Sequence, residues 1–163
     1  MDEIQKKNKE LVERFPFLAF KEYDFDTDSY YLPDDYDYST TWLDYIPEGW
    51  VKAFGEQMCE ELKEALEEYN YVDDYIIVQA KEKYNQLRIY DNGIPKGCRA
   101  WDVIDKYSNI AERTCVKCGK PATKVSMGWI SSWCDDCAKE VGGVMTDIDE
   151  FYDENWDEDP DKK

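Results

Sequence analysis

Residues 115–137 read CVKCGKPATKVSMGWISSWCDDC, and a Cys-x-x-Cys pair stands at each end of this stretch. Each pair places two thiolates within reach of one metal ion, and fifteen residues separate the two pairs. That spacing is typical of a zinc site, in which four thiolates complete the tetrahedron that zinc prefers in structural sites. We therefore expect a zinc ribbon at residues 114–144, with one structural zinc ion held by Cys115, Cys118, Cys134 and Cys137.

The residues between the two cysteine pairs carry enough apolar surface to pack against the rest of the protein. A helical pattern at 101–113 leads directly into the first pair, so we expect the ribbon to dock on the core and not to hang from a linker. The apolar side chains that we expect to form a hairpin and make this contact are Val125, Met127, Trp129, Ile130 and Trp133.

Catalysis is not expected. The chain contains no histidine, which removes the imidazole ligands of the common open zinc sites, and it has neither a phosphate-binding glycine loop nor a serine elbow. Carboxylate pairs such as Asp34–Asp35 and Asp73–Asp74 are weak signals in so acidic a chain, although a carboxylate metal site stays open as an alternative. We expect a protein that is not an enzyme.

Periodicity predicts an α+β fold, with a small core of helices and a hairpin in residues 1–113. Helical patterns cover residues 4–15 and 50–69, as well as the segment before the ribbon, and strand patterns cover 75–81 and 87–90. The end of the chain, residues 145–163, holds nine acidic residues and is expected to be an acidic tail. Its three aromatic residues, Phe151, Tyr152 and Trp156, could anchor it.

The net charge bears on the kind of partner. Of 163 residues 38 are acidic and 20 are basic, which gives a formal net charge of -18. Such a surface repels phosphate backbones and attracts basic proteins, although solubility is the simpler explanation of the charge. With 42% hydrophobic and 15% aromatic residues, the chain is too apolar to be wholly disordered.

The sequence shows no apolar run of membrane-spanning length, and its first residues lack the hydrophobic segment of a signal peptide. A cytosolic protein without membrane contact is the simplest interpretation. Reducing conditions there keep thiols available as metal ligands, which favours zinc over disulfides. We expect Cys59 and Cys98 to be ordinary free thiols.

The least ordinary segment is residues 22–48, which contain nine acidic residues, eight aromatic residues and neither lysine nor arginine. Two interpretations stay open. The segment is either a solvated loop that its rings pin to the core, or a surface that binds a basic partner. The residues that we select as partner contacts are Asp34, Asp35, Tyr36, Asp37 and Tyr38.

An alternative function is nucleic-acid binding or regulation by the ribbon protein. The expected hairpin carries Lys81, Lys83 and Arg88, and the ribbon carries three more lysines. Each group has a simpler explanation, because charges at a hairpin edge are usually solvated and lysines beside thiolates offset the charge of a zinc centre. The ribbon residues of this alternative are Lys117, Lys120 and Lys124.

Three segments resemble, in order and spacing, a family of small zinc-ribbon proteins encoded by phages and prophages of Gram-positive bacteria. They are WLDYIPEGWVKAFGEQMCEEL at 42–62, VQAKEKYNQLRIYDNGIP at 78–95 and the cysteine stretch at 115–137, and the resemblance covers the chain from about residue 10 to residue 140. The family is mostly uncharacterised, so it implies a genetic setting more than a mechanism. Small acidic proteins in that setting often inhibit host defences.

Within that setting the chain is similar to metal-containing anti-CRISPR proteins directed against the type II effector nuclease. The resemblance implies a stoichiometric inhibitor in the cytoplasm of the bacterial host, which binds the nuclease, or another basic nucleic-acid-binding host protein, and blocks nucleic-acid loading or cleavage. The nuclease holds its guide and target in a positively charged channel, so an acidic aromatic protein could occupy that surface without contacting nucleic acid itself. A protein that simply mimics DNA would not carry the lysines of the ribbon, so its contact with the nuclease could also lie away from the channel.

Overall fold

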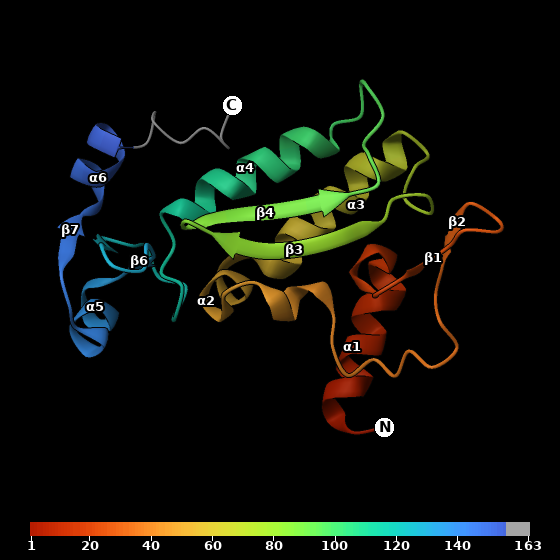
Figure 1. The fold of residues 1–163 in the computed structure, drawn as a ribbon, viewed down its shortest axis with the longest axis horizontal. Coiled ribbons are helices and arrows are strands. Elements are labelled where there is room, and N and C mark those ends of the chain that lie inside the picture. Colours follow the sequence, from red (N-terminus) through yellow and green to blue (C-terminus); the bar gives the residue numbers. More distant parts are fainter. Residues whose placement is uncertain (156–163) are drawn as a thin grey trace.

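A two-stranded sheet and two long helices form the centre of the molecule in the computed structural model, which describes residues 1–155 (Figure 1). Strands β3 (Ile77–Lys83) and β4 (Gln86–Asp91) pair antiparallel. Helix α4 (Ala100–Glu112) packs against β4 and against helix α3 (Glu56–Glu68). The fold is α+β, as the sequence predicts. The largest fully buried side chains of the main hydrophobic core are Trp50, Tyr75, Tyr107, Phe15 and Phe17.

The turn between β3 and β4 consists of two residues, Tyr84 and Asn85, and Lys83 pairs with Gln86 across it. Both turn residues have positive φ angles, +52° and +65°, as in the type I′ turns whose twist matches that of the flanking strands. Asparagine tolerates this left-handed backbone well, whereas tyrosine adopts it rarely. The two predicted strands are confirmed, with ends that differ by one or two residues from the predicted ends.

The helical pattern over residues 50–69 is confirmed, but its hydrogen bonding changes along the way. Helix α2 (Glu48–Trp50) leads into a π-helical turn (Val51–Gly55), which continues as α3. A π-helical turn is rare and often marks a contact that matters for function. Here it lies against the ribbon, because a Cβ atom built on Gly119 would come within 3.4 Å of the Cβ atom of Ala53.

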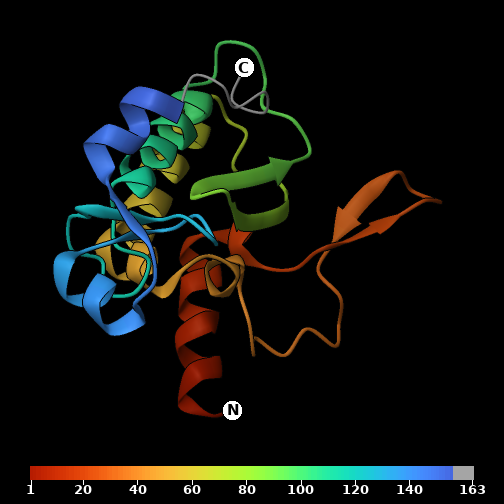
Figure 2. The same cartoon turned by 60° about the vertical axis from the view of Figure 1, so that its left-hand side comes forward.

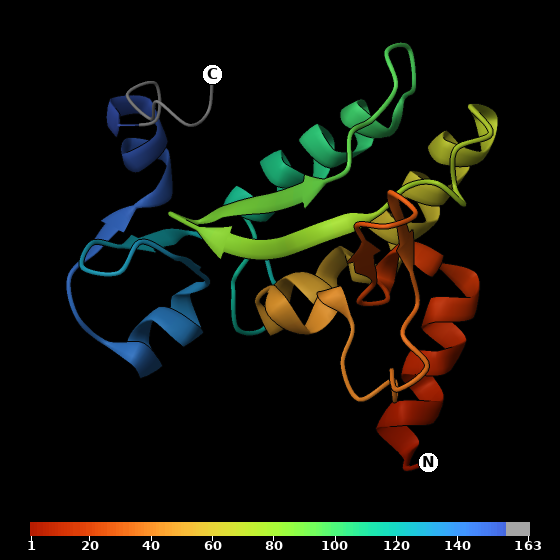
Figure 3. The same cartoon turned by 45° about the vertical axis from the view of Figure 1, so that its right-hand side comes forward.

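The acidic segment follows helix α1 (Glu3–Arg14) and a 3-10 turn at Pro16–Leu18. Strands β1 (Glu22–Asp24) and β2 (Ser29–Tyr31) form a short hairpin that projects from the body of the molecule (Figure 2). The chain then returns past α1 to a second 3-10 turn at Trp42–Tyr45. Helix α1 and this segment lie at one end of the long axis, and the ribbon lies at the other (Figures 1 and 3).

The ribbon has a three-stranded sheet that includes part of the expected tail. Strand β5 (Lys124–Ser126) pairs with β6 (Ser132–Trp133) on one side and with β7 (Met145–Asp147) on the other. Helix α5 (Asp135–Val141) connects β6 to β7, and helix α6 (Ile148–Asn155) follows. The ribbon therefore continues beyond the expected boundary at residue 144.

The reason for this longer ribbon is an apolar stripe within the acidic sequence. Ile148 and Phe151 are buried against Val125 of the central strand, and Tyr152 packs beside them. Their spacing of three and four residues places them on one face of a helix, so the acidic residues between them can face water. Trp156, the third expected anchor, lies outside the described residues.

The ribbon is docked on the start of α2 through backbone contacts. The amide of Gly49 donates a hydrogen bond to the carbonyl of Val116 at 2.9 Å, and the indole Nε1 of Trp50 donates to the carbonyl of Thr114 at 3.2 Å. A Cβ atom on Gly49 would lie 2.1 Å from the carbonyl oxygen of Cys115. Only glycine fits there, so the expectation that the ribbon packs on the core is confirmed.

A second connection runs through Asn85 at the hairpin turn, whose side chain is fully buried. Its Nδ2 has two hydrogens for three acceptors, the carbonyl of Glu112 at 3.1 Å, Oγ of Ser132 at 2.5 Å and the hydroxyl of Tyr152 at 2.7 Å. Its Oδ1 accepts from the amide of Ser132 at 2.9 Å. These bonds join the hairpin to α4, β6 and α6. A buried polar network of this kind favours one arrangement of its elements.

Replacement of Gly49 tests the close backbone contact. We expect Gly49→Ala to lower the free energy of unfolding by about 3 kcal/mol, because the added methyl group must push two backbone segments apart. Gly128→Ala is the matched control within the ribbon, since a Cβ atom at Gly128 meets nothing within 4 Å. Urea denaturation of the metal-loaded proteins measures both, and equal stabilities for the two variants would contradict the docking contact.

Replacement of Asn85 tests the buried network. Asn85→Ala should cost about 3 kcal/mol of stability, because the amide of Ser132 loses its acceptor in a buried site and the lost side chain leaves a cavity. Tyr84→Ala is the matched control, since it places alanine on the same left-handed backbone at a side chain that is exposed. If thermal and urea denaturation show the same loss for both variants, the cost belongs to the turn and not to the network.

Candidate metal centre

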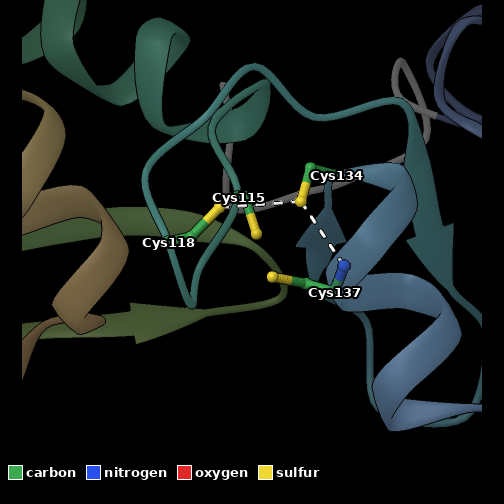
Figure 4. A group of neighbouring side chains, drawn as sticks. All are labelled: Cys115, Cys118, Cys134 and Cys137. Carbon is green, nitrogen blue, oxygen red and sulfur yellow. Dashed lines mark hydrogen bonds between the residues drawn. The ribbon is translucent and has the colours of Figure 1, made fainter.

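The four cysteines of the two Cys-x-x-Cys pairs meet at one point of the ribbon (Figure 4). All four Sγ atoms lie within 4.8 Å of one another, and those of Cys118 and Cys134 are 3.6 Å apart. A tetrahedral ion with metal–sulfur bonds of about 2.3 Å places its sulfurs about 3.8 Å apart. These sulfurs are thus too far apart for a disulfide and close enough to bind a metal ion.

The first pair, Cys115 and Cys118, lies on a tight turn. The amide of Gly119 donates to the carbonyl of Cys115 at 3.1 Å, and the amide of Cys115 donates to the carbonyl of Lys120 at 2.8 Å. Gly119 has a φ angle of +83°, which glycine adopts without strain. The turn therefore returns the chain on itself and directs both thiols to the same side.

The second pair, Cys134 and Cys137, begins helix α5. Cys134 is the N-cap residue of this helix, and its sulfur accepts a hydrogen bond from the amide of Cys137 at 3.5 Å. The two pairs are tied together by a bond from the amide of Val116 to the carbonyl of Ser132 at 3.0 Å. Three of the four thiols are buried and that of Cys118 is partly exposed, so the ligands form a largely enclosed group.

The backbone around Cys115 favours a thiolate at this residue, whereas the pKa of Cys118 in the same pair is raised. Burial by itself would raise the pKa of the Cys115 thiol, but hydrogen bonds from backbone groups at Cys118, Cys134 and Lys117 lower that pKa to about 7. Metal ligation requires deprotonated sulfur. Four protein sulfurs around one ion leave no position for water or substrate, which is the arrangement of structural sites.

The selected partner contacts are divided by the structure into exposed and packed side chains. Asp34, Asp35 and Asp37 are exposed, whereas Tyr36 and Tyr38 are partly buried against the core. The Tyr36 hydroxyl donates to the carbonyl of Thr40 at 2.6 Å. Burial raises the pKa of Tyr36 to about 12, so this hydroxyl stays protonated.

Helix α1 fixes the backbone that carries these aspartates. The side-chain amide of Gln5 donates to the carbonyl of Asp37 at 2.9 Å, and that of Asn8 donates to the carbonyl of Tyr38 at 2.8 Å. The packing of the rings agrees with the first interpretation, and binding of a basic partner stays a prediction. The rings pin it to the core, and the aspartates face water.

The basic residues of the alternative function come from two regions, and several of them have partners within the chain. The Nζ atom of Lys81 lies 5.5 Å from the ring centroid of Tyr90, and that of Lys83 lies 5.6 Å from the ring centroid of Tyr84. Lys117 forms an ion pair with Glu140 at 2.8 Å. The positive charge of this lysine is therefore directed to a carboxylate at the surface.

Two residues that position the metal centre carry no clear signal in the sequence. Gly49 has the Pro-Glu-Gly-Trp context that belongs to the resemblance, but a helical glycine does not by itself indicate a backbone contact 66 residues further along the chain. Asn85 follows a tyrosine in a hairpin turn, where asparagine is expected for backbone reasons alone. Its buried side chain emerges only from the packing.

Comparison with models of known protein families, with curated proteins and with solved structures finds no match for this chain. None of the helices in the described part of the chain is long and apolar enough to cross a membrane. The four-cysteine centre and its surroundings therefore have to be interpreted from their own geometry.

Removal of one ligand tests the metal centre. We expect the wild-type protein to contain one divalent metal ion per chain, and Cys118→Ser to lose it together with the order of the ribbon, because a four-thiolate ion is worth on the order of 10 kcal/mol. Elemental analysis and amide NMR measure the two effects. Cys98→Ser is the control, since Cys98 lies in the main core. A Cys118→Ser protein that keeps one ion and an ordered ribbon would rule the site out.

Proposed function

We propose that this protein is a stoichiometric inhibitor that binds a type II CRISPR effector nuclease by protein–protein contact and blocks nucleic-acid loading or cleavage. It acts without catalysis, and the ion in its ribbon is a single structural zinc ion. The observation that carries the proposal is the set of exposed aspartates at Asp34, Asp35 and Asp37. Helix α1 binds the backbone of their segment, and its tyrosines pack on the core.

The charge of this segment supports a basic target. Residues 22–48 contain no lysine or arginine, so their acidic side chains have no local counter-charge within the segment. A partner with a positive groove would meet a uniformly negative surface, which speeds association and selects against acidic surfaces. The channel that holds guide and target nucleic acid is such a groove.

The rigidity of the segment supports binding over simple solvation. Side chains of α1 hold its backbone carbonyls, and its tyrosines pack on the core. An ordered surface loses less conformational entropy on association than a mobile loop. The aspartates are therefore presented in a fixed arrangement, which a surface that serves only solubility does not require.

Zinc is favoured by the chemistry of the donor set. Four thiolates on a compact ribbon suit zinc, and the closed tetrahedron gives the ion no place for a reacting molecule. In this proposal the ion serves the inhibitor by holding the ribbon against Gly49. Its loss would then affect inhibition through the fold.

Neutralisation of the three aspartates tests the proposal. The triple variant Asp34→Asn, Asp35→Asn, Asp37→Asn should bind a purified type II effector nuclease roughly tenfold to a hundredfold more weakly, since exposed charge pairs contribute about 0.5–1 kcal/mol each. The variant should also show a weaker salt dependence and proportionally less inhibition of DNA cleavage. Binding and cleavage are measured with and without guide RNA, on several nucleases of this type.

A control variant with the same change in net charge distinguishes an effect of the aspartates at 34–37 from an effect of the net charge of the whole protein. Glu64→Gln, Asp102→Asn and Asp105→Asn remove three exposed charges from helices α3 and α4, away from the acidic segment. This variant should bind as the wild type does. Equal effects of the two triple variants would reject the assigned surface, and absence of wild-type binding to every nuclease tested would reject the proposed function.

A further inference from the structure

A groove of about 350 Å³ lies where the β3–β4 hairpin turn meets the ribbon. The hairpin contributes Glu82, Lys83 and Tyr84, and the loop between β5 and β6 contributes Gly128, Trp129 and Ile130. The two sides are more than forty residues apart in the sequence, so the groove exists only because the ribbon docks on the hairpin. It lies at the end of the molecule opposite to the acidic segment (Figures 1 and 3).

The aromatic side chains of this groove are unusually exposed. Trp129, which the sequence predicts to pack against the core, is 79% exposed, and Tyr84 is 58% exposed. Met127 and Val144 are also exposed, and their backbones are joined by a hydrogen bond of 3.2 Å. Within residues 1–155 no other ring or cation lies against the indole of Trp129. Tryptophan, tyrosine and methionine gathered at a surface are typical of protein interfaces.

The loop that carries Trp129 is held in place. The amide of Ser126 donates to the carbonyl of Ser131 at 2.9 Å, and the indole Nε1 of Trp133 donates to Oγ of Ser126 at 3.1 Å. The same Oγ atom donates to the carbonyl of Trp129. On the other side, the buried Asn85 fixes the hairpin turn next to Tyr84. The groove is therefore preorganised, which lowers the entropy cost of filling it.

We propose that this groove binds an arginine side chain on the surface of a basic protein partner. The guanidinium group is planar and weakly hydrated, and it stacks on tryptophan more readily than an ammonium group does. Glu82 supplies a carboxylate in the same groove, and a guanidinium can form charge-assisted hydrogen bonds with it. The inference rests on the proposed function for the partner, but the chemistry of the groove stands by itself.

The lining of the groove carries one carboxylate, Glu82, and one ammonium group, Lys83, so the net charge of the whole molecule is what favours a cation over a phosphate. Burial raises the pKa of Glu82, so a cation beside this carboxylate would offset the cost of burying its charge. Its Oε1 atom accepts only the amide of Asn85 at 2.9 Å among the bonds that the described residues provide. Lys83 carries a positive charge and its Nζ atom lies against the Tyr84 ring, which leaves Trp129 and Glu82 to contact a guanidinium. The net charge of -18 adds a field that attracts cations and repels nucleic acid.

A peptide titration tests the groove without any nuclease. The probe is acetyl-Gly-Arg-Gly-amide, added to the ¹⁵N-labelled, zinc-loaded full chain at physiological salt. We expect saturable shifts of the Trp129 indole N–H and of the Gly128 amide, with a dissociation constant of about a millimolar for so small a ligand. The same peptide with citrulline, which is neutral and nearly isosteric, should bind at least fivefold more weakly.

Two variants assign the effect to the groove. Trp129→Ala should abolish the saturable shift of Gly128, and Glu82→Gln should weaken binding severalfold while its amide oxygen still accepts the bond from Asn85. Trp101→Ala is the matched control, because Trp101 is 59% exposed on helix α4. Shifts that are confined to residues 22–48 and persist in Trp129→Ala would overturn the inference.

Other occupants give different results. If oligothymidylate shifts the Trp129 indole more strongly than the arginine peptide does, the groove takes nucleobases and the inference is wrong. If sedimentation shows a dimer that Trp129→Ala dissociates, a second copy of the chain fills the groove and the inference is also wrong.

The effector nuclease separates this inference from the proposed function. If both hold, Trp129→Ala should weaken binding to the nuclease about tenfold or more, as removal of an interface tryptophan does, and Trp101→Ala should not. A groove that binds the arginine peptide on a protein that binds no nuclease would reject the proposed function alone. Nuclease binding that is sensitive to the triple aspartate variant, with no peptide shift and no effect of Trp129→Ala, would reject the groove alone.

Discussion

The contact between Gly49 and the first cysteine pair is the constraint on which the rest of the structure depends. Two backbones meet there without a side chain between them, so the start of helix α2 and the metal-binding turn have one fixed relative position. That position places the ribbon beside the hairpin, so that the side chain of Asn85 can bind the amide of Ser132 in the ribbon. The cysteine turn is thus joined directly to the α+β core. The same contact places Trp129 beside the hairpin and so forms the groove.

The elements of this fold follow closely from the sequence, and their assembly does not. Cysteine spacing is a local pattern, and so is the periodicity of residues 50–69, so both predict their structures well. The π-helical turn at Val51–Gly55 lies against the ribbon at Gly119, a contact that no local pattern contains. The sequence predicts an acidic tail at residues 145–163, and the structure has a strand and a helix at 145–155. The high content of acidic residues suggests a solvated tail, and the apolar stripe that contradicts it consists of only Ile148, Phe151 and Tyr152.

The candidate sites show the same division. All four cysteines that the structure brings together are evident from the sequence, since the spacing of a Cys-x-x-Cys pair indicates a metal site. For residues 34–38 the sequence predicts the chemistry but not which side chains face water, because tyrosines and aspartates alternate and either could be buried. The exposure of Trp129 runs against a general preference for burying large rings. This preference is an average over many proteins, and a tryptophan that binds a partner is an exception to it.

The position of the ribbon late in the chain has a consequence for synthesis. The ribosome releases the helix that begins at Glu48 long before it releases the second cysteine pair. The core is therefore synthesised before all the residues that close the ribbon are available. Until residues 114–116 emerge, the surface of Gly49 that later meets Val116 is uncovered, and the indole of Trp50 lacks the carbonyl of Thr114. A chain whose synthesis has not yet reached the ribbon therefore exposes backbone groups that the complete chain covers.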